Sequence, residues 1–201
     1  MEKQKINITD VLTDLIKEIT IRSHFFSHID TTKLIVCLSS NKKNGRGSIY
    51  GKLVPFKFKN GSDTVTFKGK YYSIPRITNN GTDILYAIYF YLPRFFDLPA
   101  DKKLNVIFHE LYHISPDFNG DIRRMGNVKK AHGSSKKRFD LKFEKEVKSF
   151  YEYISKTYFL DFLKMDSKSL NNKYHIYARR MKIPKPIVIN NPNYKIKQSS
   201  F

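Results

Sequence analysis

Two histidines four residues apart, with a glutamate directly after the first, are the part of this sequence best suited to chemistry. They are His109, Glu110 and His113, in the stretch NVIFHELYHI. Side chains four apart on a helix share one face, so both imidazoles can bind one metal ion. Glu110 is rotated by about 100° from His109, which suits a general base acting on water better than a ligand. The alternative is a solvated pair of histidines on the wet face of a helix.

A catalytic zinc site needs a third protein ligand and keeps one position open to water. His132 is the first candidate, because it follows His113 by 19 positions in an expected loop, next to Gly133, where the backbone can turn tightly. Asp121 ranks second, and Asp117 is a further oxygen donor. The sequence therefore predicts one zinc ion (Zn²⁺) bound by the two helical histidines and His132.

The other histidines are weaker candidates. His24 and His28 form a second pair four apart, but no glutamate accompanies them, and Phe25 and Phe26 indicate a helix end packed on the core. His175 lies in a polar stretch and is expected at the surface. None of the three is predicted to bind metal.

Composition favours one folded, intracellular domain. The chain has 201 residues, of which 40% are hydrophobic and 14% aromatic, which is enough for a sizeable core. Cys37 is its single cysteine, so neither an internal disulfide nor a cysteine-based zinc cluster can form, and its apolar surroundings predict a buried thiol. No secretory signal and no apolar run long enough to span a membrane is visible, so we expect a cytoplasmic protein.

The elements that position the motif follow from hydrophobic periodicity. An amphipathic helix is expected over Ile8–Ile29, with Thr9 as its N-cap, and the motif belongs to a helix over about 100–115. A further helix is expected over Ser134–Tyr158. Short β-rich runs between Gly, Asn and Asp signals predict strands within 33–39, 49–58, 65–74 and 84–96.

The order helix, strands, helices favours an α+β fold with a small mixed or antiparallel sheet rather than alternating βαβ units. We assign residues 1–165 to this domain and 166–201 to a basic, proline-containing tail. The strand within 84–96 precedes the motif helix. It is either an edge strand that an extended substrate can join by backbone pairing or an ordinary core strand.

Positive charge dominates the chain. Lysine and arginine number 37 against 18 aspartate and glutamate, a formal charge of +19. Such a field attracts polyanions, which makes non-specific nucleic-acid binding a possible second property. The alternative is that lysine is simply common in an AT-rich genome.

The residues HELYHI, followed by HGSSKKRF, resemble the SprT-like zinc metallopeptidases. The longer run HELYHISPDFNGDIRR…KKAHGSSKKRFD is more similar still to phage-type metallopeptidases, which are zincin-like proteins. The resemblance implies that His109, His113 and His132 bind zinc and that Glu110 is the base. Many SprT-like proteins carry a C-terminal cysteine zinc ribbon, which this sequence lacks.

These observations predict a zinc-dependent peptidase that acts on a protein or peptide. Arg123, Arg124 or a tyrosine could stabilise the oxyanion, although Arg124 is better suited to pair with Asp121. A second hypothesis is a protein that binds nucleic acid or a host factor around a structural metal, closed by four protein ligands. A third is a metallohydrolase with a non-peptide substrate, because the motif specifies water activation and not the bond that is cut.

Overall fold

The computed structural model describes residues 2–40, 49–125, 135–190 and 199–200. Within these ranges the chain forms the α-helices α1 (Ile8–Arg22), α2 (Ala100–Tyr112), α3 (Lys136–Asp140), α4 (Glu144–Ile154), α5 (Tyr158–Lys164) and α6 (Ser167–Lys173). The strands are β1 (Gln4–Asn7), β2 (Leu34–Ser40), β3 (Gly51–Pro55), β4 (Thr64–Phe67), β5 (Lys70–Ser73), β6 (Ile77–Asn79), β7 (Thr82–Asp83), β8 (Tyr86–Leu92), β9 (Tyr174–Tyr177), β10 (Ile187–Ile189) and β11 (Ser199–Ser200). The expected α+β class with small sheets is confirmed.

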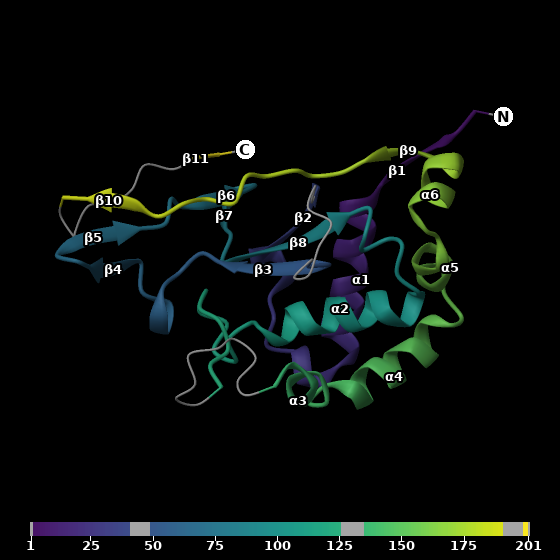
Figure 1. Ribbon diagram of the computed structural model, residues 1–201, viewed down its shortest axis with the longest axis horizontal. Coiled ribbons are helices and arrows are strands. Elements are labelled where there is room, and N and C mark those ends of the chain that lie inside the picture. The colour runs from purple at the N-terminus through teal and green to yellow at the C-terminus, as the bar shows by residue number, and fades with distance from the viewer. Residues whose placement is uncertain (1, 41–48, 126–134, 191–198, 201) are drawn as a thin grey trace.

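The central sheet has the order β2-β8-β3, with β2 parallel and β3 antiparallel to β8. Successive side chains of a strand point to opposite faces. Val36 and Leu38 therefore join the large core with α1 and α2, whereas Ile35 and Cys37 join a smaller cluster on the other face. The sheet is thus buried on both faces, and the helices pack on one of them (Figure 1).

The strand before the motif helix is an interior strand. β8 lies between β2 and β3, so both of its edges are used for pairing. The expectation that this strand offers an edge to substrate is therefore wrong, and the alternative of a core strand is correct. Among the described strands of this sheet, β3 is the edge strand on the side of α2, with which it is in contact.

The motif helix α2 is held firmly by the core. Five apolar side chains on α2 and just after it are fully buried in the large core: Leu104, Ile107, Phe108, Leu111 and Ile114. Lys103 on the same helix is also fully buried, and its Nζ donates hydrogen bonds of 2.7 Å to the carbonyls of Leu163 and Met165. Burial lowers the pKa of Lys103 to about 8. These contacts attach the C-terminal end of α5 to α2.

Two helices differ from the expected ones. α1 ends at Arg22, and its N-cap is Asn7, whose side chain accepts the backbone N–H of Thr9, so the prediction of Thr9 as the cap is wrong. The expected helix over 134–158 is two helices, because α3 ends at Asp140 and α4 begins at Glu144. The strands expected within 33–39, 49–58 and 84–96 are confirmed, and the run 65–74 forms the hairpin β4–β5.

Residues beyond 165 pair with strands from the first part of the chain. β9 lies parallel to β1, and β10 adds antiparallel to β5. The division of the chain at residue 165 stays a prediction.

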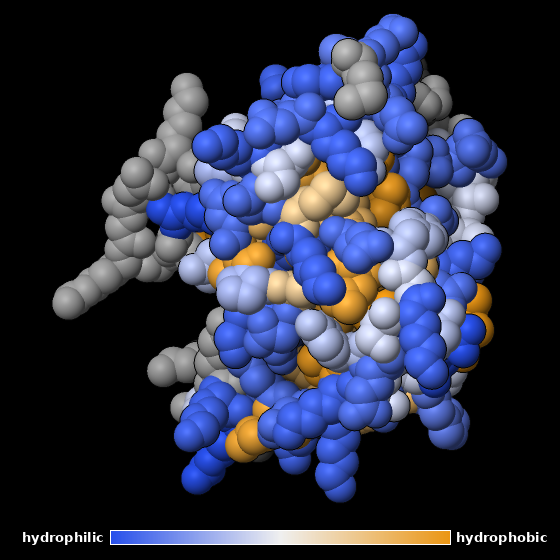
Figure 2. All heavy atoms as spheres, turned by 90° about the vertical axis from the view of Figure 1, so that its right-hand side faces the viewer, coloured by the Kyte–Doolittle hydropathy of each residue, from blue (hydrophilic) through white to orange (hydrophobic). Residues whose placement is uncertain are grey.

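Seen from the side of α4, α5 and α6, hydrophilic residues cover most of the surface, and hydrophobic residues show between them (Figure 2). Within the described ranges, no helix is both long and apolar enough to cross a membrane.

Candidate metal centre

The two motif histidines lie side by side at the C-terminal end of α2. His109 is in the last turn, and His113 is the C-cap residue that follows it. Their Nε2 atoms are 3.2 Å apart and their rings are nearly perpendicular, at 84°. Two nitrogens bound to a tetrahedral zinc at 2.0–2.1 Å would be separated by about 3.3–3.4 Å. The pair therefore fits a shared metal ion, although the same distance also suits an N–H···N hydrogen bond between the rings.

Asp140 orients His109 from the end of α3. Its Oδ1 lies 2.6 Å from Nδ1 of His109, on the side of the ring opposite Nε2. A carboxylate in this place fixes the tautomer that carries the proton on Nδ1 and makes the other nitrogen a better metal donor. This is the arrangement expected around a histidine that binds metal, and it is a second observation in favour of the site.

Asp140 is a residue of the candidate site that the sequence did not reveal. It lies 31 positions after His109, and no spacing rule connects the two. The available signal was chemical, because a metal-binding histidine almost always has a carboxylate, carbonyl or water on its second nitrogen. Asp140 is the last residue of the run HGSSKKRFD that carries the family resemblance.

Phe139 packs against both histidines. Its ring centroid lies 4.6 Å from that of His113 and 5.0 Å from that of His109, and the side chain is almost completely buried. It also contacts Tyr112 edge-on at 4.7 Å. α3 thus supplies an apolar ring and a carboxylate from adjacent positions, and together these restrict the orientation of the imidazoles.

Glu110 points to a different neighbour, the edge strand β3. Its Oε2 accepts a 2.7 Å hydrogen bond from the backbone N–H of Leu53, and the side chain is buried. The approach is possible because residue 51 is glycine. A Cβ at Gly51 would lie 2.9 Å from Cγ and 3.0 Å from Oε1 of Glu110. Leu53 and Gly51 therefore define where the carboxylate lies beside β3.

Arg124 and Asp121 form the ion pair expected from the sequence. Guanidinium nitrogens of Arg124 lie 2.9–3.1 Å from the Asp121 carboxylate, which also accepts the backbone N–H groups of Asn60 and Ile122. The hydroxyl of Tyr86 donates to the Asp121 carbonyl at 2.9 Å. These contacts support a role for Asp121 in shaping the loop after α2 rather than in binding metal.

Arg123 braces the end of α2. Its Nε donates to the carbonyl of Tyr112 at 2.7 Å, and its backbone N–H donates to the carbonyl of His113 at 2.7 Å. The guanidinium lies over the Tyr112 ring, 4.3 Å from its centroid, and burial lowers the pKa of Arg123. These contacts favour a positioning role over a direct contact with substrate.

The remaining predicted residues are placed as follows. His132 lies outside the described residues, so its role as third ligand stays a prediction. Among the described residues, no group of three or more His, Cys, Asp or Glu side chains is arranged to hold a metal ion. Asp117 and His175 are exposed, and His24 lies in the 3₁₀ turn His24–Phe26.

A groove of about 810 Å³ opens beside Asp140, between α2, α3 and α4. Asn105, Lys137 and Tyr151 are among the residues that line it. The Asp140 side chain is 40% exposed, so the carboxylate that contacts His109 is also accessible to solvent.

Comparison with known proteins places the chain in a family. No curated protein and no solved structure matches the chain. A family model described as Putative phage metallopeptidase matches residues 5–174, which includes α2 and α3. The resemblance to SprT-like enzymes is not tested by this match and stays a prediction. The match covers most of the chain, so this protein belongs to the Putative phage metallopeptidase family.

Proposed function

We propose that this chain is a zinc-dependent peptidase in which His109 and His113 bind the metal, His132 is the third ligand and Glu110 is the general base. The single observation that carries the proposal is the pair of Nε2 atoms 3.2 Å apart, with a carboxylate on Nδ1 of His109. The family to which the chain belongs supports a metal cofactor and a protein or peptide substrate.

The reaction follows from what these side chains can do. Zinc, when bound, would polarise the scissile carbonyl and lower the pKa of the attacking water. Glu110 takes a proton from that water as the new C–O bond forms, and it passes the proton to the leaving amine as the C–N bond breaks. Its contact with the Leu53 N–H holds the carboxylate in one place during both transfers.

We infer that an extended substrate approaches along β3, the edge strand of the central sheet that contacts Glu110. The Leu53 N–H points away from β8, toward α2, where it meets Glu110. A peptide lying along this edge would therefore run directly past the base. This placement supports hydrolysis of an extended chain rather than of a compact small molecule.

Metal content tests the proposal. Wild-type protein purified without added metal is expected to contain about one zinc per chain by elemental analysis. His132→Ala should lose most of it, and a chelator should abolish cleavage of a denatured protein followed on gels. Equal zinc in wild type and His132→Ala would remove His132 from the ligand set. Cleavage that survives complete zinc removal would contradict the proposed reaction.

Asp140 provides a graded test of the ligand geometry. Asp140→Ala is expected to weaken zinc binding by about 10- to 100-fold, because His109 loses the group that orients it. Asp140→Asn should fall between Ala and wild type, since the amide oxygen still accepts from Nδ1. Competition with a chelating dye measures the affinities, and Asp14→Asn, an exposed carboxylate on α1, is the control. Unchanged affinity in Asp140→Ala would show that the contact is incidental.

A further inference from the structure

A small antiparallel sheet of order β10-β5-β4 projects from the body of the molecule, at the left in Figure 1. Its hairpin β4–β5 turns at Lys68 and Gly69, both of which have positive φ. The third strand, β10, comes from near the end of the chain and pairs with β5. The strands of this sheet contain none of the residues described around the metal centre, so it is a separate feature.

One face of this sheet is apolar and exposed. Val65, Tyr72 and Val188 are direct cross-strand partners and so share a face, and Phe67 follows two positions after Val65. Phe67 is 60% exposed and Val188 53%. The rings of Phe67 and Tyr72 approach each other edge-on, with centroids 6.5 Å apart. A contiguous apolar face of this kind usually marks a binding surface.

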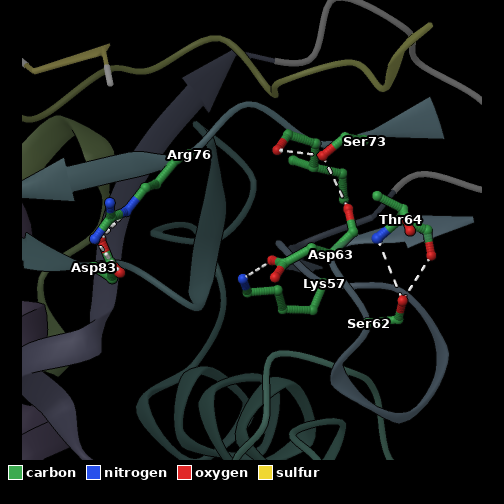
Figure 3. A network of polar contacts seen from close by, with 8 residues as sticks. Lys57, Ser62, Asp63, Thr64, Ser73, Arg76 and Asp83 are labelled. Atoms are coloured by element: carbon green, nitrogen blue, oxygen red, sulfur yellow. Dashed lines mark hydrogen bonds and ion pairs between the residues drawn. The ribbon is translucent and has the colours of Figure 1, made fainter. Parts of the chain in front are cut away.

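The charge around this face is positive. Residues 64–73 and 182–190 contain four lysines and neither aspartate nor glutamate. Two nearby acidic side chains are held by cations of their own, Asp63 by Lys57 and Asp83 by Arg76 (Figure 3). All four lysines are exposed: Lys68, Lys70, Lys182 and Lys185. An acidic partner surface would pair with the lysines but not with the exposed rings. A purely apolar partner surface would cover the rings but leave the lysines unpaired.

We propose that this face binds single-stranded nucleic acid without sequence preference. Bases would stack on Phe67, and the phosphates would lie among the lysines of the hairpin and of the segment that leads into β10. Stacking on aromatic side chains requires unpaired bases, whereas charge alone does not distinguish single strands from duplexes. The Nζ of Lys68 lies 5.6 Å from the Phe67 ring centroid, so a base on the ring and its phosphate on the lysine could be bound side by side. The inference does not depend on the peptidase function.

The test is fluorescence anisotropy of a labelled oligothymidylate of about 20 nucleotides, titrated with protein at about 50 and 200 mM salt. Phe67→Ala is expected to weaken binding at least about fivefold, the lower end of the effect of losing one stacked base. Lys68→Gln with Lys70→Gln should reduce the slope of log affinity against log salt by about 1.4, or about 0.7 per phosphate contact. Both changes are at exposed positions, and circular dichroism confirms that the variants fold.

The matched control removes the same charge elsewhere. Lys17→Gln with Lys145→Gln alters exposed lysines on α1 and α4 and should leave affinity close to that of wild type. Equal losses in the two double variants would mean that only total charge matters, and equal affinity for duplex DNA would exclude stacking. Light scattering tests whether a second copy of this chain occupies the face instead. A wild-type dimer that Phe67→Ala converts to a monomer would assign the face to that second copy and overturn the proposal.

Discussion

Glu110→Gln protein is expected to keep its zinc and its fold while its rate of peptide hydrolysis falls by at least about 100-fold, the typical contribution of a general base. Glutamine has the same shape as glutamate, and its amide oxygen can still accept the 2.7 Å hydrogen bond from the Leu53 N–H. It cannot take a proton from water. The change therefore removes the chemistry and leaves the packing around Gly51 intact.

The measurement compares cleavage of a denatured protein substrate with zinc content determined on the same preparation. Glu152→Gln, an exposed position on α4, is the matched control and should behave as wild type. Loss of zinc in Glu110→Gln would show that this residue is a ligand rather than the base. Undiminished turnover would argue against the peptidase proposal as a whole.

Replacing either motif histidine is expected to empty the metal site. His109→Ala and His113→Ala each remove one of three proposed imidazole ligands, so zinc should fall from about one per chain to a small fraction of that. The exposed residues His24 and His175 supply matched controls, and His24→Ala and His175→Ala should retain full zinc.

Both motif histidines are buried, so an alanine variant could lose zinc by losing its fold. His109→Gln keeps most of the volume beside Phe139, and it should lose zinc while its circular dichroism spectrum and thermal midpoint stay near those of wild type. Zinc retained by a folded His109→Gln would mean that His109 is not a ligand and that the zinc is bound at another place. That result would leave the chain without its proposed metal centre.

The helix that carries the site was predictable because local rules determine it. The apolar stripe of α2 has strong helical periodicity, and residues four apart must then share a face. The structure places the two Nε2 atoms together as that rule requires. The rotation of Glu110 by about 100° from His109 follows from the same helix geometry, but its contact with Leu53 does not, because 57 residues separate them.

The pairing of strands that lie far apart in the chain could not be predicted from the sequence. The run that forms β8 is apolar throughout, which indicates burial but not which strands lie on either side. The break between α3 and α4 was hidden for a related reason: Phe139 and Phe143 are both buried and keep helical spacing across the interruption. Asp140, at the end of α3, was missed together with that break.

The single cysteine of the chain lies in the middle of strand β2 of the central sheet. Cys37 on β2 is opposite Tyr89 on β8 and is fully buried, and burial raises the pKa of its thiol to about 11. The thiolate is the form that attacks thiol reagents, so the native molecule should react with them very slowly at neutral pH. Labelling then requires that the small apolar cluster around Cys37 open, and the labelling rate counts those openings. The protein therefore carries a built-in probe of how often this side of its sheet becomes uncovered, one that needs no engineered cysteine.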